Sequence, residues 1–110
     1  MSDQVSDLSA QFQALQQQYQ TIAMQKEQSA LQVLELERAE KEVDVSTGDV
    51  FKAAGPILLK ADKKTVQESL KDEKETAAIR MKRLDTQEKS VRGRLEEMQK
   101  RLMETYKVSK

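Results

Sequence analysis

The segment VFKAAGPILLK, residues 50–60, decides the fold of this chain. Its two short apolar runs predict strands over residues 50–53 and 57–60, with Ala54, Gly55 and Pro56 turning the chain between them. The chain has only three glycines and one proline, and Gly48, Gly55 and Pro56 all fall in or beside this segment. Because these residues break helices, the chain is predicted to reverse direction through one β-hairpin over about residues 49–60.

Side chains alternate along the two predicted strands, and this makes the hairpin apolar on both faces. An isolated two-stranded hairpin is marginally stable in water, and its edges carry unpaired N–H and C=O groups. We therefore expect strands of other chains to complete the sheet as an intersubunit β-barrel. Phe51 and Leu58 occupy one set of positions and Val50, Ile57 and Leu59 the other, and these five are the expected assembly residues.

Upstream of the hairpin, apolar residues recur in alternating steps of three and four, which is the seam of a coiled coil. No glycine or proline interrupts this stretch, so one helix over about residues 4–44 is predicted, on the order of 60 Å long by helix rise. The seam includes three polar positions. It consists of Val5, Leu8, Phe12, Leu15, Tyr19, Ile22, Lys26, Ser29, Val33, Leu36, Glu40 and Val43.

A second seam follows the hairpin and predicts a helix over about residues 63–106. Thr65 and Glu68 have the spacing of a capping box, and Asp62 is an alternative cap, so the helix is expected to begin within residues 62–65. This seam consists of Val66, Leu70, Lys74, Ala77, Met81, Leu84, Glu88, Val91, Leu95, Met98 and Leu102.

The two seams predict a mainly α fold, a long antiparallel two-helix coiled coil with one central hairpin, in a single domain over residues 1–110. Facing positions of an antiparallel hairpin have a nearly constant sum of residue numbers. In the predicted register Lys26 faces Met81 and Tyr19 faces Glu88. Seven further facing pairs have residue numbers that sum to 106 or 107. They are Val5 with Leu102, Leu8 with Met98, Phe12 with Leu95, Leu15 with Val91, Ile22 with Leu84, Ser29 with Ala77 and Leu36 with Leu70.

Composition argues against several classes of function. With 37% hydrophobic, 4% aromatic and 35% charged residues, the chain is too polar for an ordinary globular core, so one elongated domain is expected. Nineteen basic and nineteen acidic residues cancel, although residues 80–110 hold ten basic and five acidic residues, a local net charge of plus five. Cysteine and histidine are absent, which removes the usual thiolate and imidazole groups of catalytic and metal sites. No catalytic, cofactor or metal site is expected.

The location of the protein is predicted from the same sequence. The N-terminus lacks a basic start followed by an apolar run, and no apolar stretch approaches the roughly 18 residues that a membrane span needs. We expect a soluble protein of the cytoplasm.

Residues 50–60, set between two long helices, resemble the single central hairpin of prefoldin beta-type subunits. The run Phe-Lys-x-x-Gly-Pro-hydrophobic-Leu-hydrophobic-Lys, which begins at Phe51, is most similar within that family to the eukaryotic subunit six class. Alpha-type subunits have two central hairpins, and this chain has room for one. The hairpin carries most of the resemblance, because the helices match only as heptads.

The resemblance implies a function. Prefoldin is a hexamer of two alpha-type and four beta-type subunits that captures unfolded or nascent chains, actin and tubulin among them in eukaryotes. It passes these clients to the group II chaperonin without using ATP. The chain accordingly lacks a GxxxxGK[ST] loop for nucleotide phosphates.

The free ends of the two helices are the predicted client-binding surface. Seam residues there form the coiled coil, but fraying at an open end exposes them intermittently. Met103 and Tyr106 lie beside the seam and are the stronger candidates for direct contact, since methionine adapts to varied partners. The predicted client-binding residues are Val5, Leu8, Phe12, Leu95, Met98, Leu102, Met103 and Tyr106.

Two other functions remain open from the residues alone. A structural coiled-coil tether or adaptor would account for the heptads but not for the apolar hairpin. A nucleic-acid-binding arm would use the basic C-terminal third, which lacks an aromatic stacking platform. An enzyme has the least support, because the carboxylates lie on exposed helix faces.

Overall fold

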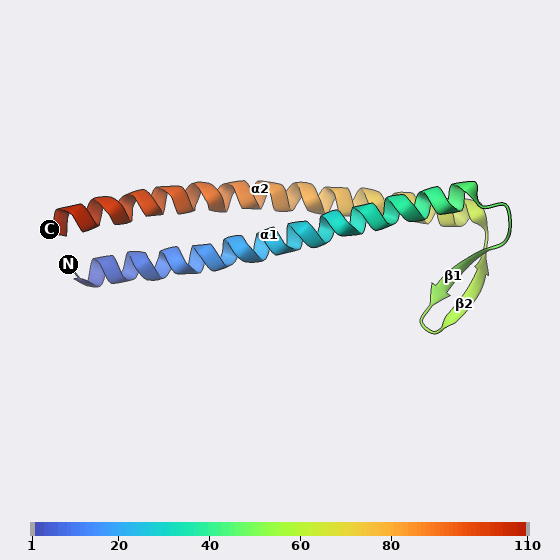
Figure 1. The fold of residues 1–110 in the computed structure, drawn as a ribbon, viewed down its shortest axis with the longest axis horizontal. Helices are drawn as coiled ribbons and strands as arrows, with labels where there is room; N and C mark the ends of the chain where they lie inside the picture. The colour runs from blue at the N-terminus through green and yellow to red at the C-terminus, as the bar shows by residue number, and fades with distance from the viewer. Residues whose placement is uncertain (1, 110) are drawn as a thin grey trace. The chain divides into compact units, whose positions relative to one another are not determined.

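The structure, a computed structural model, describes residues 2–109. Helix α1 (Ser2–Val45) is followed by strands β1 (Val50–Ala54) and β2 (Ile57–Ala61) and by helix α2 (Lys63–Ser109) (Figure 1). The predicted mainly α fold, with one antiparallel hairpin between two long helices, is confirmed. Over the residues that the structure describes, neither helix is long and apolar enough to cross a membrane.

The chain divides into two compact units, and each helix contributes to both. Unit 1 consists of Met1–Glu27 and Lys82–Lys110, and unit 2 consists of Gln28–Met81, including the hairpin. Within unit 1, α1 and α2 are joined by an ion pair between Lys26 and Asp85, and within unit 2 by a hydrogen bond between Gln32 and Arg80. A groove in unit 1 also joins Gln11 to Arg101, and an ion pair in unit 2 joins Glu40 to Lys74, so the two helices are antiparallel in each unit. That residues 1–110 form a single domain stays a prediction.

The helices begin and end where local chemistry dictates. Helix α1 contains no glycine or proline and ends at Val45, before the Ser46-Thr47-Gly48 sequence. Helix α2 begins after Asp62, whose Oδ2 accepts hydrogen bonds from the Thr65 backbone N–H at 3.4 Å and the Thr65 hydroxyl at 3.2 Å. Of the two predicted caps, Asp62 is therefore the one used.

Both predicted seams are confirmed by burial, since each of their residues is buried or half-buried. In unit 1, Ile22, Leu84 and Val91 form a buried cluster. In unit 2, Ala77 is 1% exposed, and Ser29 and Leu36 are also buried. Gly93 lies off the seam in α2, and no atom lies within 4 Å of the position of an added Cβ, so this glycine is not required by packing.

The predicted facing register needs correction. The sequence pairs Ile22 with Leu84, but Ile22 packs in one cluster with both Leu84 and Val91. Because these two residues are seven positions apart on α2, Ile22 fits between them, opposite Glu88. A side chain of a coiled coil fills a hole between several residues of the facing helix. Pairing each seam residue with a single facing residue therefore shifts one helix along the other by one step of the seam, three or four residues.

Contacts of long side chains also depart from the predicted register. Lys26 is predicted to face Met81, but its ammonium group contacts Asp85 and Glu88. The residue numbers of Gln32 and Arg80 sum to 112 rather than 106 or 107. Side chains lean toward the N-terminus of their own helix, and in an antiparallel pair this lean raises the sum further.

The hairpin closes through a two-residue turn. Ala54 pairs with Ile57, so only Gly55 and Pro56 lie between the strands, and each strand is one residue longer than predicted. Gly55 has a φ of 61°, which fits the first position of a type II′ turn and favours glycine there. A turn of this type matches the twist of the flanking strands, which explains why Ala54 joins the ladder.

Candidate assembly and client-binding surfaces

The register of the hairpin separates its apolar residues onto two faces, as predicted. Phe51 pairs with Lys60 and Ala53 with Leu58, and directly paired residues share a face. The opposite face carries the pairs Val50 with Ala61, Lys52 with Leu59 and Ala54 with Ile57. Each face therefore combines bulky apolar side chains with one lysine.

Four of the five predicted assembly residues are exposed. Phe51 is 55% exposed, Ile57 59%, Leu58 70% and Leu59 54%, while Val50 is half-buried. The sheet has only the two strands β1 and β2 in the described chain, so each strand has one edge without a neighbour. An exposed sheet of this kind is suited to strand addition by another chain.

The helix ends in unit 1 divide the eight predicted client-binding residues into two groups. Leu8 is buried, and Val5, Phe12, Leu95, Met98 and Leu102 are half-buried in the seam. Met103 and Tyr106 are 57% and 59% exposed. The structure thus distinguishes six seam residues from two that are already accessible in the folded helix.

Four charged residues of the two seams form one oppositely charged pair in each unit. In unit 1, Lys26 Nζ of α1 lies 3.3 Å from Glu88 Oε2 of α2. In unit 2 the signs are reversed, and Lys74 Nζ of α2 lies 3.2 Å from Glu40 Oε1 of α1. We call these the charged seam pairs. Sequence reasoning found their positions but missed the pairing, for which the signal is a lysine and a glutamate at seam positions of opposite helices.

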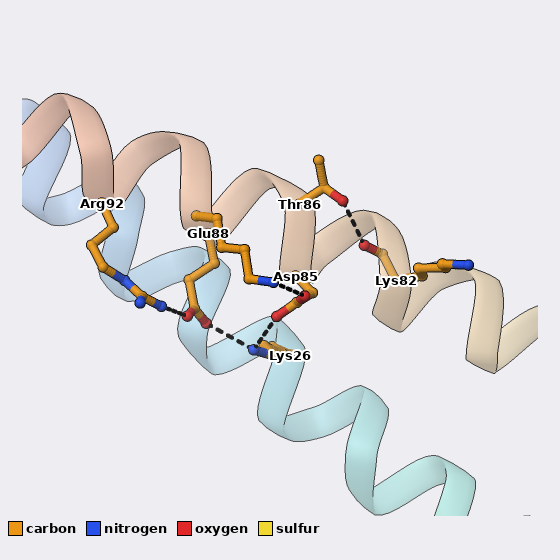
Figure 2. A network of polar contacts seen from close by, with 7 residues as sticks. Lys26, Lys82, Asp85, Thr86, Glu88 and Arg92 are labelled. Carbon is orange, nitrogen blue, oxygen red and sulfur yellow. Dashed lines mark hydrogen bonds and ion pairs between the residues drawn. The ribbon is translucent and has the colours of Figure 1, made fainter.

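The charged seam pair of unit 1 belongs to a wider network, shown in Figure 2. Lys26 Nζ also donates to Asp85 Oδ1 at 2.8 Å, and Lys89 Nζ lies 3.2 Å from Asp85 Oδ2. Arg92 donates to the Glu88 carboxylate from one turn farther along α2. Glu88 is 8% exposed, so a buried carboxylate is held by two cations.

The network shifts the pKa values of its members. Hydrogen bonds to Asp85 and then to Glu88 raise the pKa of Lys26 above its ordinary value. Hydrogen bonds from Lys26 and then from Lys89 lower the pKa of Asp85. Burial acts to raise the pKa of Glu88, but hydrogen bonds from Lys26 and Arg92 together outweigh it, so this pKa is lowered. Lys26, Asp85 and Glu88 are therefore all charged at neutral pH.

The charged groups of this network are engaged with one another. Among residues 2–109, no group of three or more acidic side chains is placed to hold a metal ion. The shifted pKa values belong to groups that are paired with one another across the seam, which is the behaviour of a structural ion-pair network. The accessible apolar side chains include those of the hairpin and, near the ends of the helices in unit 1, Met103 and Tyr106.

Comparisons with known proteins agree with this arrangement. The family model for prefoldin subunits matches residues 6–108. The prefoldin subunit beta of Archaeoglobus fulgidus is 42% identical over 102 residues, which cover 90% of this chain and 87% of that protein. The prefoldin subunit beta of Methanothrix thermoacetophila is 36% identical over 104 residues, covering 93% and 87%.

A solved structure shows the same fold. The crystal structure of the prefoldin beta subunit from Thermococcus strain KS-1 superposes with a TM-score of 0.84 at 28% identity, and the match covers 93% of this chain and 91% of that one. The relatives named here are archaeal, and the nearer likeness to the eukaryotic subunit six class stays a prediction. Sequence, fold and exposed hairpin lead to one conclusion: the chain belongs to the prefoldin family of chaperone subunits, in its beta class.

Proposed function

We propose that this chain is a holding subunit of a prefoldin hexamer with two alpha-type and four beta-type subunits. In this proposal the hairpin joins the subunits, and the helix ends of unit 1 bind unfolded or nascent polypeptides without ATP. Delivery of such chains to a chaperonin is the known role of the family. The group II chaperonin of the cytoplasm is the proposed recipient, and actin and tubulin are the proposed clients if the protein is eukaryotic.

The exposed two-faced hairpin is the observation that carries this proposal. Phe51 and Leu58 on one face and Ile57 and Leu59 on the other are all more than half exposed. Burial of apolar surface stabilises association by about 25 cal/mol per Å², so large side chains on both faces favour a partner on each. A coiled-coil tether would not require such a hairpin, whereas a subunit of a shared β-barrel would.

Client binding is assigned to the accessible side chains of unit 1. Met103 and Tyr106 are exposed on α2, beside the half-buried seam residues Met98 and Leu102. A flexible thioether and an amphipathic ring tolerate partners of varied shape. Because so few side chains are involved, each single contact is weak, and several subunits must act on one client together.

The test is a substitution that changes these side chains but not the seam. Met103→Gln with Tyr106→Gln should leave the mass of the complex and its helical content unchanged, and should weaken suppression of aggregation of an unfolded protein without nucleotide. Ile79→Gln is the matched control, since Ile79 is 62% exposed but lies in unit 2. Equal suppression by the double variant and the control would remove Met103 and Tyr106 from the client site.

A further inference from the structure

One flank of the helix pair repeats a pattern of glutamine on α1 and mainly arginine on α2. Both sets recur every seventh residue, so each lies along one line on its helix. In unit 2 one residue of each set is in direct contact, because Arg80 Nη1 donates a hydrogen bond to Gln32 Oε1 at 3.4 Å. The α1 set is Gln11, Gln18, Gln25 and Gln32, and the α2 set is Arg80, Gln87, Arg94 and Arg101.

In unit 1, residues of the same two sets line two grooves. A groove of about 440 Å³ has Gln11, Ala14 and Leu15 on the α1 side and Arg94, Glu97, Met98 and Arg101 on the α2 side. A second groove of about 580 Å³ has Gln18 on one side and Arg94 again on the other. Because Arg94 lines both, the two grooves adjoin along this flank of unit 1.

The arginines of the unit 1 grooves are not neutralised by the protein. Across the described residues 2–109, neither Arg94 nor Arg101 forms an ion pair, and both are exposed. The α1 residues that line the two grooves are uncharged and include one glutamine in each, Gln11 and Gln18, and α1 carries no charged residue from Leu8 to Gln25. Glu97 is the one acidic residue that lines the first groove, which leaves a net positive charge beside an apolar floor of Leu15 and Met98.

The corresponding groove in unit 2 has the opposite character. It has a volume of about 580 Å³, and Glu68, Asp72 and Glu73 line it together with Arg80. Arg80 is moreover engaged by Gln32. An excess of cationic groups over acidic ones is therefore a property of the unit 1 grooves.

We propose that the unit 1 grooves bind acidic segments of unfolded polypeptides in an extended conformation. Arginine presents a planar fork of donors that matches a carboxylate, and glutamine amides can hydrogen-bond the main chain of an extended peptide. Leu15 and Met98 would contact an apolar side chain between two carboxylates. This inference rests on the proposed holding function and defines the class of client segment that unit 1 favours.

The spacing of the arginines defines the segment further. Arg94 and Arg101 are two helical turns apart, about 10 Å by helix rise. In an extended polyproline-II-like chain, every third side chain points to the same side at intervals of about 9 Å. Glu97 lies between the two arginines and disfavours a carboxylate at the midpoint. The groove should therefore prefer acidic residues at every third position, with apolar residues between them.

A nucleic acid fits these grooves less well. Sequence-tolerant binding of single strands uses aromatic side chains for base stacking, and neither groove is lined by one. A continuous row of phosphates would also meet Glu97. The apolar floor and the single acidic residue therefore favour a peptide.

The test uses the complete complex purified through this subunit and short fluorescent peptides. One peptide carries aspartate at every third position with leucine and alanine between, a second has the same composition with its aspartates adjacent, and a third has lysine in place of aspartate. We expect the first to bind most tightly by anisotropy. Arg94→Gln with Arg101→Gln should weaken binding of the first peptide about tenfold, because it removes two exposed ion pairs and each contributes up to about fivefold. Binding should also weaken as salt is raised.

Lys82→Gln with Arg83→Gln is the matched control, because it also removes two positive charges, from exposed positions that line neither groove. Equal binding of the first peptide by the double variant and by this control would overturn the inference, and so would tighter binding of heparin or an RNA homopolymer than of the peptide. If the wild-type complex still suppresses aggregation of a neutral unfolded protein, the proposed holding function survives that result. A complex that holds no client at all would instead refute the proposed function.

Discussion

At the scale of single residues, the ion-pair network of unit 1 is the feature with the clearest measurable consequence. Glu88 is buried in the seam, where an unpaired carboxylate would be destabilising. Lys26 and Arg92 supply its counter-charges. The three side chains are therefore coupled, and the stability of unit 1 depends on their protonation.

We predict that the ion-pair network stabilises unit 1 at neutral pH and that this stabilisation is lost in acid. The pKa values of Asp85 and Glu88 are lowered in the fold, so their contribution is fully present above the pKa values of the unfolded chain, about 3.9 and 4.3, and is lost as pH falls through the lower folded values. The pKa of Lys26 is raised, so its contribution is present below about 10.4 and is lost only as pH rises through the folded value.

Thermal unfolding followed by circular dichroism between pH 2 and 7 measures this effect. Lys26→Met should lower the melting temperature at pH 7 and reduce the steepness of the acid loss, because the carboxylates lose a partner whose charge lowers their pKa values. Arg83→Met, which removes a positive charge outside the network, is the control. An acid transition of the same steepness in all three proteins would show that the network does not govern it.

At the scale of the elements, the alternating steps of three and four predicted both helices, and the apolar runs around Gly55 and Pro56 predicted the hairpin. Burial confirms all the seam positions. The register could not be predicted in the same way, because side-chain lean and hole-filling depend on the shape of the facing helix. The pairing of Lys26 with Asp85 was equally hidden, since it depends on how far a flexible chain reaches. Ala54 was predicted in the turn but pairs with Ile57, because Gly55 with a φ of 61° permits a tighter reversal than the three-residue turn expected.

Disulfide formation distinguishes the corrected register from the predicted one. Leu15 lines a groove with Arg94 and Met98, which places it opposite Leu95 rather than Val91. The chain has no cysteine, so cysteines can be introduced in pairs without background. Leu15→Cys with Leu95→Cys should crosslink faster within one chain than Leu15→Cys with Val91→Cys. Faster crosslinking of the second pair would restore the register with sums of 106 or 107.

Assembly should depend on the hairpin and not on the helices. Phe51→Ser with Leu58→Ser removes the two large apolar side chains of one face. Each fully buried side chain of this size contributes about 1.5–3 kcal/mol, so the loss should release the subunit from its complex. Size-exclusion chromatography with mass measurement reports release, while circular dichroism should show unchanged helix content. A complex of normal mass would refute the proposed role of this face.

At the scale of the whole molecule, holding a client and building the particle are assigned to different units. The proposed assembly residues all lie in unit 2, and the proposed client-binding residues all lie in unit 1. Changes in one should therefore leave the other intact. Several copies of unit 1 acting on one client would raise the effective concentration of weak contacts.

We predict that deleting residues 96–110 leaves the mass of the complex unchanged and weakens its suppression of aggregation only in part. The deletion removes Met98, Leu102, Met103 and Tyr106 from this subunit, but other subunits retain their helix ends. Suppression should be measured by light scattering, with and without ATP, and the two conditions should agree. Undiminished holding by a complex that is trimmed at every subunit would place the clients elsewhere, for instance at the barrel.

The charged seam pairs also affect which helices pair with each other when several subunits are close together. In the proposed hexamer, a second copy of this chain would bring its own helices close enough to compete for α1 or α2. If α1 paired in parallel with α1 of a second copy, Lys26 would meet Lys26 and Glu40 would meet Glu40, and like charges in a seam repel. Pairing α1 with α2 of the same chain instead joins Lys26 to Glu88 and Glu40 to Lys74. The charges thus favour pairing of α1 with an α2 helix over pairing with a second α1, and the exposed hairpin stays available for the proposed contacts with neighbouring subunits.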